Sequence, residues 1–322
     1  MFTVPALGLG TSQLGNLGRV VSDDDAQAVV STAWDGGIRY FDTAPHYGLG
    51  LSERRVGRLL QQYPRDQFTL STKVGRILTP SPDTAHLRDT EGFDVPADLK
   101  REWDFSADGV RRSIEASLDR LGLDRIDIAY IHDPDDHWTQ ASQEAAPALV
   151  ALREEGLIGA VGVGMNDSAM LAKFVAECDV DLVMCAGRFT LLEQPALGDL
   201  LPVAQDRGVG VVIAGVFNSG LLATARPRPG ATYDYAEAGA DLVQRANDIA
   251  DICEQHGTTL PVAAQAFPWL HPAVVSVVVG CRSASQVQSA VDAEALGVSP
   301  ELWTALDEAG LLAPGLLGET TR

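Results

Sequence analysis

Basic residues are scarce in this chain. Its 322 residues include 24 Lys and Arg against 44 Asp and Glu, which gives a formal net charge of −20 at pH 7. Proteins that bind nucleic acid or anionic lipid depend on positive charge for much of their affinity. The composition therefore argues against nucleic acid and a membrane surface as partners.

Cysteines and long apolar runs are also scarce. The four cysteines, Cys178, Cys185, Cys253 and Cys281, form no C-x-x-C pair, so we expect reduced, buried thiols. No apolar run approaches the roughly 18 residues of a membrane helix. The first residues lack a basic region followed by an apolar one. We therefore expect a cytoplasmic protein.

Short apolar runs alternate with amphipathic stretches along the chain, which is typical of a parallel sheet with crossover helices. The candidate strands cover residues 6–10, 40–44, 68–74, 126–132, 158–164, 182–187, 210–216 and 275–280. The expected helices cover 23–35, 53–62, 107–121, 143–155, 168–178, 198–207, 242–256, 262–270 and 285–293, the first three capped by Ser22, Ser52 and Ser106. Eight strands close a barrel, so we predict one α/β domain over residues 1–322, a (β/α)8 TIM barrel with long carboxyl-end loops.

Two connections are longer than simple barrel loops. Residues 76–105 follow the third strand and residues 217–239 follow the seventh, and a tail over 311–322 is a third covering element. Long loops at the carboxyl end of a barrel usually carry binding functions. We predict lids over a substrate site, with disordered insertions as the alternative.

Four residues of complementary chemistry stand at or after the ends of predicted strands. Asp42 ends the second strand, Tyr47 follows in a loop, and Lys73 and His132 close the third and fourth. A Tyr hydroxyl titrates near pH 10 and is a poor base unless a neighbouring ammonium favours its anion. Asp42, Lys73 and Tyr47 fit such a proton relay, with His132 donating to the substrate oxygen. Each residue alone is more often structural, but four at successive strand ends favour an active site.

These residues resemble the Asp/Tyr/Lys/His tetrad of the aldo-keto reductase superfamily, which implies a barrel oxidoreductase with Asp42, Tyr47, Lys73 and His132 as catalytic residues. Segments 131–137, 187–194 and 216–222 are similar to the branch that oxidises aldoses such as L-fucose, D-arabinose or L-galactose at C1, and to related pyridoxal 4-dehydrogenases. Both substrate types form cyclic hemiacetals, whose oxidation gives a lactone. A small sugar or pyridoxal-like molecule is the expected partner, and a general aldehyde or ketone reductase is the alternative. The sequence leaves the oligomeric state unknown.

None of the four residues can accept a hydride, so the chemistry needs a carrier. Gly8 and Gly10 lack the third glycine of a Rossmann fingerprint. The family resemblance instead implies that NAD(P) is bound by Gly10, Thr11, Ser12, Asp42, Asn166, Arg188, Phe217, Asn218, Ser219, Gly220, Gly280, Arg282 and Gln286. Many NADP-specific members carry Arg where Gln286 stands, and Gln cannot form the charge-assisted fork to a 2′-phosphate. We expect a modest preference for NAD, with Arg282 as a partial substitute for the missing charge.

Four aromatic or imidazole side chains are candidate walls of the substrate pocket, although each is also an ordinary loop anchor: His46, Trp103, Phe105 and Trp138. Asp135 and Asp136 suit polyol hydroxyls as acceptors. Two further classes of function remain as alternatives. The run from His132 to His137 offers oxygen and imidazole ligands to a divalent metal, as in a metal-dependent barrel hydrolase. Pro134 breaks that run, so we expect no metal. A nucleotide-sensing regulatory subunit is the other class, and the complete tetrad argues against it.

Overall fold

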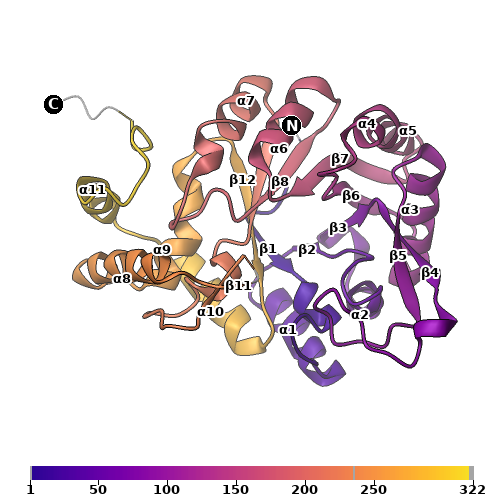
Figure 1. Cartoon of the computed structure of the whole chain (residues 1–322), viewed down its shortest axis with the longest axis horizontal. Helices are drawn as coiled ribbons and strands as arrows, with labels where there is room; N and C mark the ends of the chain where they lie inside the picture. Colours follow the sequence, from indigo (N-terminus) through magenta and orange to yellow (C-terminus); the bar gives the residue numbers. More distant parts are fainter. Residues whose placement is uncertain (1, 235, 319–322) are drawn as a thin grey trace.

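The computed structural model describes residues 2–234 and 236–318, and it contains the predicted barrel (Figure 1). Eight parallel strands close on themselves in the order β1, β12, β9, β8, β7, β6, β3, β2. Their bounds are β1 Leu7–Gly10, β2 Tyr40–Asp42, β3 Thr69–Val74, β6 Ile126–His132, β7 Ile158–Met165, β8 Leu182–Ala186, β9 Gly210–Ala214 and β12 Val274–Gly280. Every predicted strand is present, with its limits moved by at most two residues, so the (β/α)8 prediction is confirmed.

Successive side chains of each strand point alternately into the barrel and toward the helices, and they form two hydrophobic cores. The smaller core fills the barrel and consists of Val4, Tyr40, Ile128, Tyr130, Ala160, Leu182, Met184, Val212 and Val278. The larger core lies between the strands and the helices. In β2, Tyr40 belongs to the inner core and Phe41 to the outer one. The same alternation turns Asp42 back toward the barrel axis, together with Ser71 and Lys73 of β3.

Two tyrosine rings, Tyr40 and Tyr130, occupy the barrel interior and are fully buried. Gly8 and Gly162 leave the space for them. A Cβ on Gly8 would lie 2.7 Å from the Tyr40 ring, and one on Gly162 would lie 2.5 Å from the Tyr130 ring. A side chain at either glycine therefore forces a ring out of the close-packed interior.

Helices surround the barrel (Figure 1). They are α1 Asp23–Asp35, α2 Leu51–Leu60, α3 Ala107–Leu121, α4 Trp138–Gln140, α5 Ala146–Glu154, α6 Ser168–Glu177, α7 Leu200–Arg207, α8 Ala240–Gln255, α9 Leu260–Ala266, α10 Ala284–Leu296 and α11 Pro300–Glu308. A π-helical turn, Ala141–Ala145, joins α4 to α5, so the helix expected from residue 143 begins at Trp138. Helix α11 was not predicted. None of the described helices is long and apolar enough to cross a membrane.

Two of the three predicted serine caps are confirmed. The Ser22 hydroxyl accepts from the Asp25 amide, and the Ser106 hydroxyl accepts from the Gly109 amide. The Ser52 cap is wrong, because α2 already begins at Leu51. Ser52 is instead fully buried, where its hydroxyl donates to the Thr11 carbonyl over 2.8 Å.

The cysteine prediction holds with one difference. All four cysteines are free, and Cys185, Cys253 and Cys281 are buried, whereas Cys178 is half-buried. Burial raises the pKa of the Cys185 thiol to about 12, so that side chain behaves as a small hydrophobic group.

The first long connection is an ordered hairpin. Strands β4 Arg76–Pro80 and β5 Leu99–Trp103 pair antiparallel, with Arg76 opposite Trp103. A buried ion pair between Arg101 and Asp89, 2.7 Å apart, fixes the segment between them, and Arg101 also donates to the His46 carbonyl. A disordered insertion is therefore the wrong description of residues 76–105.

The second long connection carries the short strands β10 Thr232–Tyr233 and β11 Ala236–Glu237. The third predicted covering element, the tail, has its described residues packed on the outer core through Leu311, Leu312 and Leu316. The Gln194 amide oxygen accepts from the Ala313 amide and ties the tail to the loop after β8. Residues 319–322 of the predicted covering tail lie outside the described residues.

Candidate active site

Strands β2, β3 and β6 are neighbours in the barrel and bring three of the predicted residues together at their carboxyl ends. The Lys73 Nζ donates to Asp42 Oδ2 over 2.7 Å and to the Thr43 carbonyl over 2.9 Å. Both members of this ion pair are buried. Burial lowers the pKa of Lys73, but Asp42 and Tyr47 together outweigh burial and raise it above its usual value. Lys73 is therefore a fixed buried cation.

A chain of hydroxyls runs from Asp42 into the barrel interior. The Ser71 hydroxyl donates to Asp42 Oδ1 over 2.6 Å. The Tyr40 hydroxyl lies 3.1 Å from Ser71 Oγ and 3.1 Å from the Tyr130 hydroxyl. Because a carboxylate can only accept, Ser71 must donate to it, Tyr40 to Ser71, and Tyr130 to Tyr40. The barrel interior thus holds the Asp42 carboxylate from the side opposite Lys73.

Tyr47 lies in the loop after β2, with the Lys73 Nζ 4.7 Å from its ring centroid. Burial raises the pKa of the Tyr47 hydroxyl to about 12, although the Lys73 ammonium pulls it down and Asp42 pushes it up. The sequence correctly predicts that Lys73 lowers the pKa of Tyr47, but burial raises this pKa by more. Tyr47 is therefore protonated at neutral pH and can donate a proton.

His132 is buried at the end of β6, its ring centroid 6.0 Å from that of Tyr47. Burial, followed by the positive charge of Arg76 and then of Lys73, holds the pKa of His132 well below its usual value. The imidazole is therefore neutral at physiological pH. The Arg76 guanidinium, 3.1 Å from His132 Nδ1, is the neighbour that the sequence did not indicate.

The four predicted wall residues differ in position. The His46 ring faces the site, 5.8 Å from His132, and burial lowers its pKa. Trp103 is 49% exposed and stacks on Phe105. Phe105 is fully buried, so it supports Trp103 rather than facing solvent itself. Trp138 packs against Phe174 of α6, with a centroid distance of 4.6 Å.

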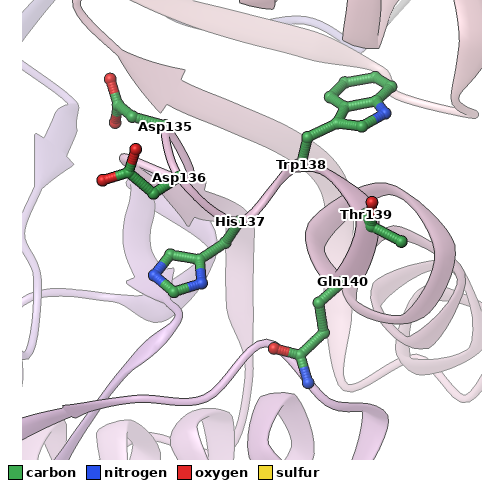
Figure 2. Close-up of a pocket in the computed structure, with 6 residues that line it drawn as sticks. All are labelled: Asp135, Asp136, His137, Trp138, Thr139 and Gln140. Carbon is green, nitrogen blue, oxygen red and sulfur yellow. The ribbon is translucent and has the colours of Figure 1, made fainter.

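A recess of about 350 Å³ lies in the loop after β6 (Figure 2). It is lined by Asp135, Asp136, His137, Trp138, Thr139 and Gln140. In Figure 2 the two carboxylates lie together, while the Trp138 indole points away from the His137 ring. Its lining within the described chain does not include the predicted catalytic residues, so the recess is separate from the candidate active site, although its loop follows His132.

The metal interpretation finds no support in this loop. Among residues 2–234 and 236–318, no three His, Cys, Asp or Glu side chains gather as metal ligands do. Arg76 also donates to Asp133 over 2.8 Å, which places a guanidinium beside both His132 and Asp133. A fixed positive charge at this position opposes a metal cation.

The barrel mouth offers features that fit a nicotinamide cofactor. Gly10 and Gly280 pair across β1 and β12 and expose backbone without side chains, and a Cβ on Gly280 would lie 2.7 Å from the Gln13 amide. After β9, Asn218 is buried and its Oδ1 has no hydrogen-bond partner among the described residues. Asn166 is exposed at the end of β7. A buried acceptor without a donor fits a ligand that supplies one.

Among the predicted cofactor residues, both arginines and Gln286 already have partners. Arg188 forms a 2.8 Å ion pair with Asp234 and donates to the Asn166 carbonyl. Arg282 donates to the Leu17 carbonyl over 2.8 Å, and its own amide donates to Gln286 Oε1. The guanidinium of Arg282 is thus held toward the amino-terminal loop.

Several of the predicted cofactor positions lie in or next to two short turns. Ser12 opens a 3-10 turn, Ser12–Gly15, directly after the buried Thr11. Phe217 precedes a second such turn, Asn218–Gly220, which contains Ser219 in the left-handed region at φ 56°. Both turns lie at carboxyl ends of barrel strands, where parallel barrels bind their ligands.

A closed parallel barrel that carries a buried Asp–Lys pair, a protonated Tyr and a neutral His at its carboxyl end offers groups that can move a proton at a carbonyl or hydroxyl group. The sequence matches the aldo/keto reductase family over residues 6–310, and the chain belongs to this family. The superfamily resemblance is thereby confirmed. The protein is an oxidoreductase of a family that uses nicotinamide cofactors.

Individual relatives cover nearly the whole chain. It is 49% identical to a D-threo-aldose 1-dehydrogenase of a Pseudomonas species, over 96% of this chain and 95% of the relative. It is 39% identical to a pyridoxal 4-dehydrogenase of Microbacterium luteolum, over 97% and 95%. Among solved structures, an aldo-keto reductase from Bacillus halodurans is 26% identical, with a TM-score of 0.73 and coverage of 96% and 93%.

Proposed function

We propose that this protein is an aldose 1-dehydrogenase that oxidises a cyclic hemiacetal to a lactone. The observation that carries the proposal is the buried Asp42–Lys73 pair beside the Tyr47 ring. The 49% identity to a D-threo-aldose 1-dehydrogenase supports the substrate class.

The roles of the residues follow from their charges. The bound nicotinamide supplies the acceptor for the hydride that leaves the anomeric carbon. In its tyrosinate form, Tyr47 takes the proton of the anomeric hydroxyl as the carbonyl of the lactone forms, and in the reverse direction the protonated Tyr47 returns that proton. Lys73 stabilises the tyrosinate, and Asp42 holds Lys73 in place. His132 donates a hydrogen bond to the reacting oxygen.

The cofactor would be held by the residues named from the family resemblance at the barrel mouth, including Gly10, Asn166, Asn218 and Gly280. We propose NAD as the preferred form, because Gln286 offers no charge to a 2′-phosphate. Arg282 does not supply that charge in its present position, since it donates to the Leu17 carbonyl. We further propose a cytoplasmic location and a single domain.

A second candidate substrate is a pyridoxal-type aldehyde in its hemiacetal form, supported by the 39% identity to a pyridoxal 4-dehydrogenase. The recess lined by Asp135 and Asp136 favours a polyol, because carboxylates accept hydrogen bonds from several hydroxyls. His46, whose ring centroid lies 5.8 Å from that of His132, and Trp103, 5.2 Å from the ring of His137, complete the proposed substrate walls.

The test is NAD reduction by the purified protein with L-fucose, D-arabinose, L-galactose and pyridoxal side by side, with the product identified by mass. A lactone, or the aldonic acid formed from it by hydrolysis, supports the proposal. Efficient reduction of simple aldehydes without turnover of any of the four would make the protein a general carbonyl reductase.

A further inference from the structure

Arg76 is held by three neighbours at the edge of the candidate active site. Its Nη1 lies 3.1 Å from His132 Nδ1, and its Nη2 donates to Asp133 Oδ2 over 2.8 Å. Its Cζ lies 4.4 Å from the Trp103 ring centroid. The side chain is 12% exposed. An arginine with three such neighbours is fixed in position, because each one removes rotamer freedom.

The guanidinium of Arg76 determines which nitrogen of the His132 imidazole carries the proton. Arginine has donors only and no acceptor, so Nδ1 of His132 must be the acceptor in this contact. A neutral imidazole carries one proton, which then belongs to Nε2. Nε2 is 3.5 Å from Asp133 Oδ2 and donates no hydrogen bond within the described part of the chain. Its N–H therefore remains free to bond another oxygen.

We propose that Arg76 is a positioning residue that fixes His132 as the Nε2–H tautomer, so that His132 presents a donor to the substrate oxygen. The proposal rests on the role given to His132 in the proposed function. Arg76 acts through His132 and not on the reacting atoms.

The groups that face His132 support this role. Arg76 from β4 and Lys73 from β3 are cations, and Asp133, next in the chain, is the anion. The uncharged His46 and Tyr47 rings approach from the loop after β2. After burial, Arg76 contributes most to the lowered pKa of His132. Loss of Arg76 thus raises that pKa, so the imidazole gains a proton at a higher pH than in the wild type.

The hairpin explains why the guanidinium stays in place. Arg76 and Trp103 are directly opposite each other on β4 and β5, where cross-strand side chains interact. Stacking on the indole leaves the edge of the guanidinium, with its N–H groups, directed at His132 and Asp133. The lid and the catalytic histidine are therefore connected through one side chain.

The direct test is 15N NMR of wild-type protein labelled at histidine, with the His132 signals assigned by His132→Ala. At pH 7 we expect a single Nε2–H tautomer with Nδ1 as acceptor. Arg76→Met should give a mixture of tautomers, lower kcat by about 10–10³-fold and add an acid limb to the pH profile. Arg76→Lys, which keeps a cationic donor, should recover part of the rate.

Lys100→Met is the matched control, since it removes an exposed charge from the same hairpin and should leave rate and pH profile unchanged. An Nδ1–H tautomer in the wild type overturns the proposal even if the Arg76 variants fail to fold. An unchanged pH profile in Arg76→Met overturns it too, while inactivity of His132→Ala keeps the proposed function. Near-normal rates in His132→Ala would instead remove the role of His132 itself.

Discussion

Replacement of Lys73 by Met removes the only cation in contact with the Tyr47 ring among the described residues. The Lys73 Nζ lies 4.7 Å from the ring centroid of Tyr47, and for two unit charges at that separation and an effective dielectric constant of about 20 the interaction is about 3.5 kcal/mol, or about 2.6 in pKa. Water at the open mouth screens part of this, so we expect the pKa of Tyr47 to rise by about 2. Below the pKa, a rise of about 2 lowers the fraction of tyrosinate by about 100-fold.

Oxidation by Lys73→Met at pH 8 should therefore fall about 100-fold relative to wild type, and the basic limb of the pH–rate profile should move to higher pH. The assay is initial NAD reduction over pH 6–11 with the best substrate of the panel. A loss of less than about tenfold at pH 8, or a rate in Lys73→Met that does not rise with pH, would show that Lys73 does not act through the pKa of Tyr47.

The Lys73→Met experiment also needs a control for lost stability. Lys73→Met leaves the buried Asp42 carboxylate without its cation, which costs about 3–5 kcal/mol. The double variant Asp42→Asn/Lys73→Met holds neither charge of this pair, so its Tm should lie closer to that of the wild type. Asp42 also raises the pKa of Tyr47, so the basic limb of the double variant should lie between those of Lys73→Met and wild type.

The remaining predictions concern the acid, the cofactor and the packing. Tyr47→Phe should bind cofactor normally, measured by fluorescence titration, and turn over about 10²–10⁴-fold more slowly; a rate above a tenth of wild type would refute its role. Gln286→Arg should move the ratio of kcat/KM toward NADP by about 10–150-fold, whereas Gln286→Ala, which only loses the contact with the Arg282 amide, should not. Gly57→Ala should lower the free energy of unfolding by about 1–3 kcal/mol in a denaturant melt, because a Cβ there would lie 2.1 Å from the Leu121 carbonyl oxygen. An unchanged or higher midpoint would mean that α2 and α3 move apart without cost.

Periodicity and strand order were enough to predict the barrel and to bring Asp42, Lys73 and His132 together. Each of the three stands at the carboxyl end of a strand, and parallel neighbours place those ends at one rim. Their convergence therefore needs no knowledge of side-chain packing.

Three features of the site region depend on side-chain packing between distant segments, which the sequence did not indicate. Arg76 was assigned to a loop, because nothing in its local pattern pairs it with Trp103, 27 positions later on the other strand of the hairpin. Ser52 resembled a helix cap, yet three-dimensional contacts bury it against Thr11. The raised pKa of Tyr47 depends on burial, which composition cannot report for a loop residue.

The hydroxyl chain behind Asp42 restricts where protons can travel. Every O–H in it points toward the carboxylate, and it ends at Tyr130, whose pKa burial raises well above the usual value. Apolar core residues such as Ile128 and Val212 surround Tyr130. Under the proposed function, a proton released during oxidation has to leave through the mouth of the barrel, so the hairpin that bears Trp103, the predicted lid, would control the exit of the proton as well as the entry of the substrate.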